Sequence, residues 1–310
     1  MRTWLAACMF LAAGTAAAGA EPLREGYVPV KGARLFFRET GSGPPIIVIH
    51  GGPDFDMNYL LPDMDRLAGR FHLVYYDQRG RGKSAAGVRP EDVSLESEVS
   101  DLDTLRKFLH LKEFVLLGHS WGGVLAAAYA ARHPGAVSRL ILLNTAPLTH
   151  DDFLLLRAAF SARRPPADAT QMRAIASGEA FRMGNADTVA AYYRLHFRMT
   201  VRDTAILARL VQNLGRGFTP DGILKARAIE DRLRGETWLD TAYDALRPLS
   251  ALPIPTLVMH GDYDFIPVEC AAHAARVMPG ARLVVLKECG HFAYMEKPEE
   301  VRREITNFLK

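Results

Sequence analysis

The sequence lacks long runs of like charge, internal repeats and clusters of metal-ligating side chains. Its 310 residues include 38 Lys and Arg against 35 Asp and Glu, a formal net charge of +3. No basic run is long enough to follow a nucleic-acid backbone, so we expect no nucleic-acid partner. No His, Cys, Asp or Glu residues have the spacing of a zinc site, which argues against a zinc protein. With 49% hydrophobic residues, the chain can instead bury a substantial core.

The first twenty residues resemble an export leader. Arg2 provides a positive start, Trp4–Ala13 is apolar, and Ala18-Gly19-Ala20 has the small-x-small pattern of a signal-peptidase site. The apolar stretch is too short for a membrane span, which needs roughly 20 residues. We therefore expect residues 1–20 to be a cleaved signal peptide and the mature chain to be periplasmic or secreted, with no stable membrane insertion.

Strand-like and helix-like segments alternate from Tyr27 to about Ala146. Ile46–Ile49 is a continuous run of β-branched residues, which is typical of a strand buried on both faces. Three later segments have the same apolar character: Leu73–Tyr76, Phe114–Leu117 and Leu140–Leu143. Amphipathic helical stretches lie between them. Repeated β-α-β units predict an α/β fold, with a mostly parallel sheet and helices on both faces.

The alternation stops between Pro147 and about Arg247, where helical stretches are broken by Pro and Gly and no buried strand is evident. It resumes at Thr256–Met259. We therefore expect a core of residues 21–146 and 248–310 and an inserted helical cap of residues 147–247. In parallel sheets the ligand crevice lies at the carboxyl ends of the strands, so the cap is expected to shape a pocket there.

The strongest local signal is Gly118-His119-Ser120-Trp121-Gly122, which follows the strand Phe114–Leu117 and precedes a helix starting near Val124. A G-x-S-x-G nucleophile elbow requires this strand–turn–helix setting. The turn is so tight that neighbouring side chains would clash, and Gly118 and Gly122 remove those Cβ atoms. Ser120 then projects at a helix N-terminus, where the dipole favours developing negative charge. We predict that Ser120 is a nucleophile.

A nucleophilic serine needs a base, and the base needs an acid that orients it. His291 follows one late strand and two aspartates follow another, in the chain order that this elbow requires. We predict His291 as the base. We favour Asp264 over Asp262 as the acid because Asp264 lies further along its loop and can reach His291, whereas Asp262 is expected to bond local backbone. Asn144 ends an earlier strand, but an amide cannot stabilise an imidazolium.

The tetrahedral intermediate of acyl transfer needs two N–H donors for its oxyanion. The Trp121 N–H at the helix start is one candidate. The second is expected in the loop His50-Gly51-Gly52-Pro53, because glycines let the backbone approach a substrate oxygen closely. Within this loop we choose Gly52. The predicted catalytic set requires no cofactor.

Three motifs together resemble the proline iminopeptidase family of α/β-hydrolases: His50-Gly51-Gly52-Pro53, Asp77-Gln78-Arg79-Gly80-Arg81-Gly82-Lys83-Ser84 and Gly118-His119-Ser120-Trp121-Gly122-Gly123. Two shorter segments also match: Gly261-Asp262-Tyr263-Asp264 and Gly290-His291. The resemblance covers roughly residues 27–146 and 248–310, and it implies an α/β-hydrolase fold. It implies a triad and two oxyanion donors at the matched positions: Ser120, Asp264 and His291, with Gly52 and Trp121. It also implies that the Asp-Gln-Arg-Gly stretch is a scaffold beside the site.

The sequence departs from that family in two places. Asp54 and Phe55 follow Pro53, where the family usually continues with glycine. The family also has acidic cap residues that hold the substrate's free amino group, and none of the cap glutamates aligns with them: Glu179, Glu230 and Glu236. The cap aromatics have two interpretations, a pocket lining or a helix-packing face: Tyr192, Tyr193, His196 and Phe197.

Removal of the leader leaves Cys270 and Cys289 of the 3 cysteines. A disulfide between them would brace the loop that carries His291, and two separate buried thiols are the alternative.

Gly82-Lys83-Ser84 resembles the end of a phosphate-binding loop. Asp77 stands where that motif needs a glycine, so we interpret this segment as a structural turn.

We therefore expect an exported serine hydrolase that forms an acyl-enzyme on Ser120 and acts on a small molecule or short peptide. The first hypothesis is an aminopeptidase that releases N-terminal residues, especially proline. The second is a carboxylesterase or lactonase with the same mechanism, whose cap would not need carboxylates. The third is a non-catalytic ligand-binding protein, which a complete triad argues against. Epoxide or haloalkane hydrolysis would need an aspartate in place of Ser120. The sequence does not indicate an oligomeric state.

Overall fold

A central sheet organises the computed structural model, which describes residues 23–310, so the predicted signal peptide lies outside the described residues. The sheet has 8 strands in the order β1-β2-β4-β3-β5-β6-β7-β8. The bounds are β1 (Arg24–Val30), β2 (Ala33–Thr40), β3 (Pro45–Ile49), β4 (His72–Tyr76), β5 (Phe114–His119), β6 (Val137–Leu143), β7 (Thr256–Gly261) and β8 (Arg282–Leu286). β2 pairs antiparallel with β1 and β4, and all later neighbours pair parallel. The predicted α/β fold with a mostly parallel sheet is confirmed.

The inner strands are buried on both faces, as their unbroken apolar runs predicted. Ile47 and Ile49 of β3 pack into the core on one face, whereas Ile46 and Val48 pack into the core on the other. Successive side chains of a strand point to opposite faces, which produces this division. Full burial of each such side chain stabilises the fold by roughly 1.5–3 kcal/mol. The sheet therefore lies between two hydrophobic cores and contributes side chains to both.

Helices cover both faces of the sheet. One core is formed with α1 (Leu95–Phe108), α2 (Trp121–Arg132), α9 (Leu246–Leu249) and α10 (Val268–Val277). The other is formed with α11 (Ala293–Glu296), α12 (Pro298–Phe308) and the short 3-10 helices η1 (Met57–Leu60) and η2 (Asp63–Leu67). Helix α1 begins with a capping box, in which the Ser94 and Ser97 side chains each bond the other's backbone N–H.

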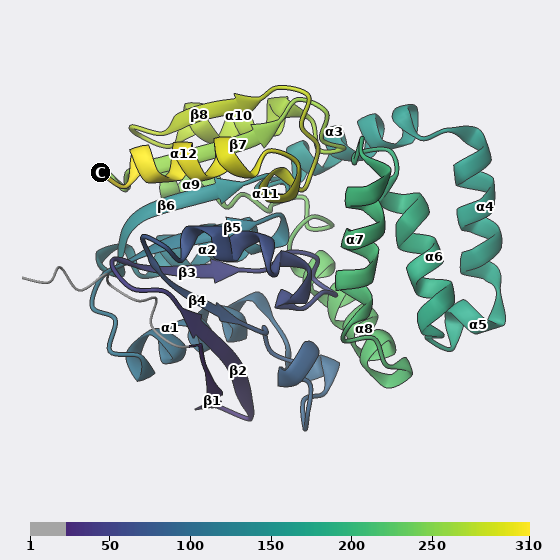
Figure 1. Cartoon of the computed structure of the whole chain (residues 1–310), viewed down its shortest axis with the longest axis horizontal. Helices are drawn as coiled ribbons and strands as arrows, with labels where there is room; N and C mark the ends of the chain where they lie inside the picture. Colours follow the sequence, from purple (N-terminus) through teal and green to yellow (C-terminus); the bar gives the residue numbers. More distant parts are fainter. Residues whose placement is uncertain (1–22) are drawn as a thin grey trace, which may run out of the picture.

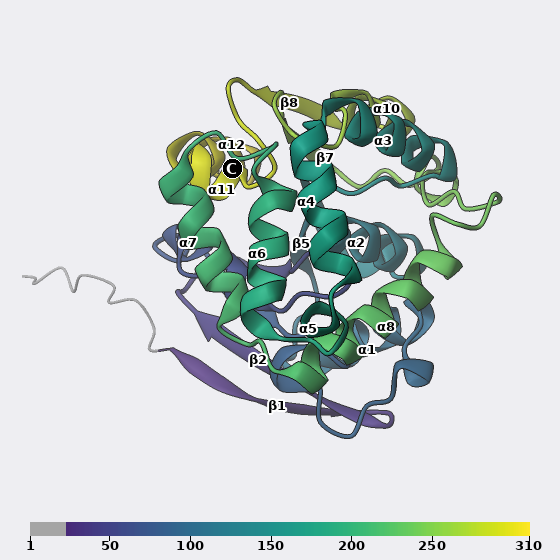
Figure 2. The same cartoon turned by 90° about the vertical axis from the view of Figure 1, so that its right-hand side faces the viewer.

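The chain between β6 and β7 is largely helical. Before α9, its helices are α3 (His150–Arg163), α4 (Pro166–Ser177), α5 (Glu179–Arg182), α6 (Ala186–Phe197), α7 (Thr204–Gly215) and α8 (Pro220–Glu236). Figure 1 shows α4, α6, α7 and α8 grouped beyond one end of the sheet, and Figure 2 views this group from its outer side. No helix in residues 23–310 combines the length and apolar character that crossing a membrane requires.

The two ends of the inserted helical segment lie side by side where the chain leaves and rejoins the core. Thr149 and Asp244 form an isolated antiparallel bridge. The His150 N–H donates to the Tyr243 carbonyl at 2.9 Å, and the Ala245 N–H donates to the Leu148 carbonyl at 2.8 Å. Helix α9 follows directly and buries its leucines in the core, so the predicted boundary between residues 247 and 248 falls inside this helix.

The two described cysteines are free and buried, so the hypothesis of a Cys270–Cys289 disulfide is wrong. Cys270 lies on α10, with Sγ 3.6 Å from the carbonyl oxygen of Asp152. Cys289 lies in the loop after β8, with Sγ 3.7 Å from the carbonyl oxygen of Gly290. Burial raises the pKa of both thiols, that of Cys270 to about 12. Each thiol is therefore a small buried group with its own neighbours.

Candidate active site

Ser120 occupies a strained turn between β5 and α2. Its backbone has φ 54° and ψ −120°, and α2 begins at the next residue, three positions before the predicted start near Val124. A Cβ at Gly118 would overlap the carbonyl group of Gly122, and a Cβ at Gly122 would overlap that of Ile49. The two glycines therefore allow the close packing that holds Ser120 in a conformation that side chains rarely adopt. This is the geometry of a nucleophile elbow.

The loops after β7 and β8 bring Asp264 and His291 together. His291 Nδ1 lies 3.0 and 2.9 Å from the two carboxylate oxygens of Asp264, and both residues are 2% exposed. Burial raises the pKa of Asp264, but the neighbouring His291 and His260 outweigh this effect and hold that pKa at about 2. The ionised carboxylate favours a proton on Nδ1, which leaves Nε2 as the nitrogen that can accept one.

The competing aspartate has different partners. Asp262 Oδ1 accepts a long hydrogen bond from the Cys289 N–H at 3.4 Å, and Oδ2 lies 3.7 Å from Lys287 Nζ. Asp262 therefore bonds the neighbouring loop after β8 rather than the backbone of its own loop, which differs from the expectation, and the structure brings only Asp264 to His291.

Asn144, just after β6, contacts the predicted acid, Asp264. Its Nδ2 donates to Asp264 Oδ2 at 2.8 Å and to the Gly290 carbonyl at 3.0 Å. The Ile266 N–H donates to the other Asp264 oxygen at 3.0 Å. Sequence reasoning considered Asn144 only as a replacement acid and missed this contact. The sequence did contain a signal for this contact, because Asn144 is a polar residue at the end of a strand and the neighbouring strand leads to Asp264.

A cap hydroxyl also holds the acid and base loops. Thr200 lies between α6 and α7 and is fully buried. Its Oγ1 accepts from the His291 N–H at 3.1 Å and from the Phe265 N–H at 3.2 Å. One threonine of the cap thus fixes the backbone at both members of the Asp264–His291 pair.

The loop after β3 is held by its first residue. His50 Nε2 accepts from the Gln78 N–H at 3.0 Å, so Nδ1 is the nitrogen that donates to the Gly51 carbonyl, also at 3.0 Å. Burial and the charge of Arg81 lower the pKa of His50 to about 3, so the ring is neutral. The C=O and N–H of one trans peptide point in opposite directions, so fixing the Gly51 carbonyl also fixes the Gly52 N–H. The Trp121 N–H lies in the first turn of α2, where N–H groups have no partner within the helix.

The Asp-Gln-Arg-Gly stretch lies beside this loop and braces it. Gln78 Nε2 donates to the His50 carbonyl at 2.7 Å, and Gln78 Oε1 accepts from Arg81 at 2.7 Å. Arg79 forms a bidentate pair with Asp101, at 2.8 and 2.5 Å. These buried contacts agree with the scaffold role that the family resemblance implied.

Ser120, His291 and Gly52 line one cavity of about 410 Å³, which is enclosed by core loops and cap helices. The wall is largely aromatic, with contributions from Phe55, Phe153, Phe160, Tyr192, Tyr193, Phe197, Trp238, Phe265 and Phe292. The cap aromatics whose role the sequence left open therefore line the pocket. Within residues 23–310, no group of three or more His, Cys, Asp or Glu side chains is arranged to hold a metal ion.

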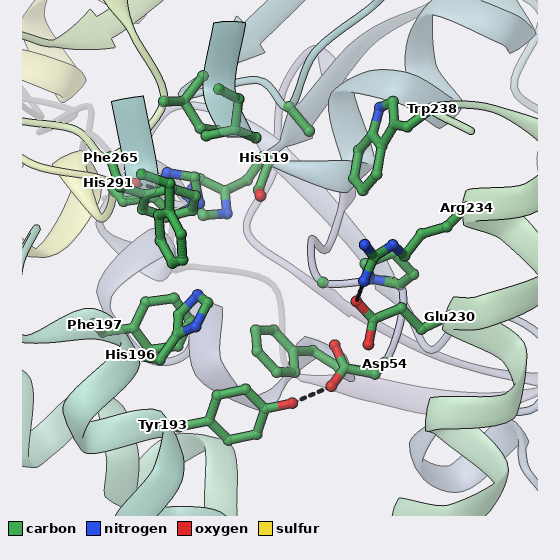
Figure 3. Close-up of a pocket in the computed structure, with 18 of the residues that line it drawn as sticks. Asp54, His119, Tyr193, His196, Phe197, Glu230, Arg234, Trp238, Phe265 and His291 are labelled. Carbon is green, nitrogen blue, oxygen red and sulfur yellow. Dashed lines mark hydrogen bonds and ion pairs between the residues drawn. The ribbon is translucent and has the colours of Figure 1, made fainter. Parts of the chain in front are cut away.

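Two carboxyl groups lie across the cavity from His291 and Phe265 (Figure 3). Asp54 accepts a hydrogen bond from the Tyr193 hydroxyl, and Glu230 of α8 lies 3.6 Å from Arg234. Burial raises the pKa of Asp54, although the Tyr193 hydrogen bond opposes this shift. Burial and the nearby Asp54 charge raise the pKa of Glu230 to about 8. At neutral pH this pair therefore retains a proton.

Sequence reasoning treated Asp54 only as a departure from the family and could not place Glu230. Of the three cap glutamates, Glu230 is the one that lines the cavity among the described residues. Glu236 instead accepts from the Leu95 N–H at 3.0 Å, outside the cavity. Asp54 and Glu230 are 176 positions apart, so no local pattern links them.

The chain belongs to the alpha/beta hydrolase fold family, whose model matches residues 44–298, and it is a hydrolase of this fold. The proline iminopeptidase of Heyndrickxia coagulans is 28% identical over 296 residues, covering 92% of this chain and 98% of that protein. The proline iminopeptidase of Saccharolobus solfataricus is 26% identical over 301 residues, covering 93% and 92%. A solved esterase structure from Thermogutta terrifontis aligns with a TM-score of 0.68 at 25% identity, covering 92% of this chain and 98% of that one. The resemblance to proline iminopeptidases is confirmed.

Proposed function

We propose that the protein is a serine aminopeptidase of the proline iminopeptidase type, which removes N-terminal residues from short peptides. The observation that carries this proposal is the Asp54–Glu230 pair, which faces the same cavity as Ser120 and His291. A peptide's α-amino group has a pKa of about 7.7–8.0, so it is largely cationic at neutral pH. A carboxylate pair in an aromatic cavity complements this cation.

The position of Asp54 suits an N-terminal residue. The ammonium nitrogen of such a residue is separated from its carbonyl carbon only by Cα, so the anion that binds it must lie near the oxyanion donors. Asp54 follows Gly52-Pro53 directly. Binding of an ammonium group would drive off the proton that Glu230 retains, because a nearby positive charge favours the ionised carboxylate.

The chemistry follows an acyl-enzyme route. His291 Nε2 takes the Ser120 proton as Oγ attacks the substrate carbonyl carbon, and Asp264 stabilises the imidazolium through Nδ1. The N–H groups of Gly52 and Trp121 donate to the oxyanion, and in serine hydrolases one such donor contributes about 2.7–4 kcal/mol. His291 then protonates the leaving amine. Water repeats the sequence to release the acyl group from Ser120.

A carboxylesterase or lactonase with the same mechanism is the second candidate. The aromatic wall of the cavity suits an apolar acyl or alcohol group, which needs no carboxylate partner. Arg234, 3.6 Å from Glu230, can also neutralise that carboxylate without a substrate amine.

A parallel assay separates the two candidates. Proline p-nitroanilide and p-nitrophenyl butyrate would be given to the wild type and to Ser120→Ala. We expect turnover of the aminoacyl anilide, with kcat lowered at least ~10⁴-fold by the substitution. Ester turnover without anilide turnover would favour the esterase. Full activity of Ser120→Ala would overturn the serine mechanism.

We further propose that the mature protein is exported and begins at Glu21. The small-x-small pattern at Ala18-Gly19-Ala20 supports this start. N-terminal sequencing of protein recovered from the periplasm or medium should give Glu21 as the first residue. An intact Met1 in that fraction would contradict cleavage.

A further inference from the structure

A chain of buried hydrogen bonds joins the three loops of the candidate active site. The Gly51 N–H donates to Tyr59 Oη at 2.5 Å, Tyr59 Oη lies 2.7 Å from His119 Nδ1, and His119 Nε2 lies 2.9 Å from the His291 carbonyl oxygen. Gly51 adjoins Gly52, and His119 adjoins Ser120. The chain therefore reaches the loop of the oxyanion donor, the nucleophile and the base.

The partners fix the direction of every hydrogen bond in this chain. The His291 carbonyl can only accept, so His119 Nε2 must carry a hydrogen. Burial and the nearby His291 lower the pKa of His119 to about 3, so its ring is neutral and Nδ1 is an acceptor. Tyr59 Oη consequently donates to Nδ1 while it accepts from Gly51. Only this one arrangement of protons satisfies all the groups.

Packing restricts the chain as strongly as its hydrogen bonds do. Tyr59 and His119 are each 1% exposed. The ring centroids of His119 and His291 are 5.0 Å apart, and those of His119 and Tyr59 are 5.6 Å apart. Tyr294 Oη donates to the Tyr59 carbonyl at 3.0 Å, which braces η1 from the other side. Loss of one member would leave a buried donor or acceptor unpaired.

We propose that Tyr59 and His119 are positioning residues. They hold the loop His50-Gly51-Gly52-Pro53, which carries the predicted oxyanion donor, in a fixed position relative to Ser120 and His291. His50 orients the peptide that carries the Gly52 N–H, and the Tyr59–His119 chain fixes that loop relative to the elbow. Oxyanion stabilisation requires donors about 2.7–3.1 Å from the developing charge. A misplacement of about 1 Å can cost on the order of 100-fold in rate. The inference rests on the proposed serine mechanism.

A pair of matched tyrosine substitutions tests this role. Tyr59→Phe removes the bridging hydroxyl, whereas Tyr76→Phe removes another buried hydroxyl, one without a hydrogen-bond partner in the described residues. The readouts are kcat and KM for p-nitrophenyl butyrate and the affinity for phenylboronic acid, whose tetrahedral adduct occupies the oxyanion site. We expect Tyr59→Phe to lower kcat about 10–100-fold, to weaken boronate binding by a similar factor and to leave KM within about twofold. Tyr76→Phe should leave all three unchanged, and a purely structural role would lower only the melting temperature.

Substitution of His119 gives an independent test should Tyr59→Phe fail to fold. His119→Gln keeps one donor and one acceptor, whereas His119→Leu keeps neither. We expect the glutamine variant to retain kcat and boronate affinity about 10-fold better than the leucine variant. Equal values for these two variants, or for Tyr59→Phe and Tyr76→Phe, would overturn the positioning role. If those values were equal and Ser120→Ala still abolished activity in the same assay, the positioning role would be overturned and the serine mechanism would be retained.

Discussion

Asp264 contacts His291 at one end of the cavity, and Glu230 lines the cavity across from His291. Burial raises the pKa of both carboxyl groups, yet their outcomes are opposite. The positive charges of His291 and His260 hold the pKa of Asp264 at about 2, and His291 also donates a hydrogen bond to it. Glu230 lies near the like charge of Asp54, and its pKa rises to about 8. The sign of the neighbouring charges, rather than the degree of burial, decides which carboxyl group stays ionised.

The comparison separates a preorganised end of the cavity from an adjustable one. At the core end, every charge already has its partner before a substrate arrives. At the cap end, Arg234 lies 3.6 Å from Glu230 and Arg157 and Arg164 also line the cavity, so a cationic ligand would share the two carboxyl groups with these side chains. Substitutions at the core end should therefore lower kcat for every substrate, whereas those at the cap end should change KM for particular substrates.

The largest effect is expected at the acid. Asp264→Asn keeps the shape of the side chain but removes the charge that stabilises the His291 imidazolium, so kcat should fall by about 10⁴-fold for anilides and esters alike. Asp262→Asn is the matched control and should stay within a few-fold of the wild type, because an asparagine oxygen can still accept from the Cys289 N–H. Steady-state kinetics of both variants would check this. A comparable loss in Asp262→Asn would reverse the choice of acid.

The next effect concerns Asp54 and Glu230, the pair that we propose to bind the substrate amine. Glu230→Gln removes the negative charge that Glu230 would carry beside a bound ammonium group, so KM for an aminoacyl anilide should rise about 10–100-fold, by analogy with the loss of one partner from a buried charge pair. The ester p-nitrophenyl butyrate has no ammonium group, and its KM should change less than about threefold. Glu236→Gln, on the same helix but outside the cavity, provides the control. Equal losses for the ester and the anilide would assign Glu230 to a structural role.

The pH profile should show the same division. As pH rises from 6 toward 8, Glu230 loses its proton and can bind an ammonium group, so kcat/KM for the anilide should increase about 5–10-fold. Above pH 8 the substrate's own amino group loses its charge, and the profile should fall. In Glu230→Gln the contribution of Glu230 to the rising limb should disappear. An identical profile for an ester would contradict this assignment.

The smallest effect is expected where the cap supports the core. Thr200→Val leaves the N–H groups of His291 and Phe265 without their acceptor, which should cost about 1–3 kcal/mol of unfolding free energy. We expect kcat to fall only a few-fold for both substrates, because Asp264 and Asn144 still orient His291. Urea denaturation and kinetics would measure the two effects. Thr170→Val, at an exposed site of α4, should change neither.

The sequence predicted the core end because its signals are local. The β-branched run Ile46–Ile49 and the glycines around Ser120 are each contained within one short segment. Loop position alone was sufficient to favour Asp264 over Asp262. Backbone sterics and burial act over a few residues, so these features can be derived without knowing the fold.

The cap end depends on contacts between distant segments. Tyr193 and Asp54 are 139 residues apart, and Asn144 and Asp264 are 120 residues apart. No spacing rule connects such pairs, because their approach depends on how α6 and β6 are placed against the loops. The separate environments of Cys270 and Cys289 were hidden for the same reason. These contacts require the tertiary fold before they can be recognised.

The bridge between Thr149 and Asp244 has a consequence for how this architecture can diversify. It pins the two ends of the inserted segment together, whatever lies between them. The entropic cost of closing a chain segment grows only with the logarithm of its length, by about 0.6 kcal/mol for each doubling. Changes in the length of this segment therefore add little closure entropy, whereas exchange of the whole segment would also remove Thr200 and the cap side chains buried in both cores. The bridge thus makes the length of the segment, and not its contacts with the core, the property that can vary at low cost.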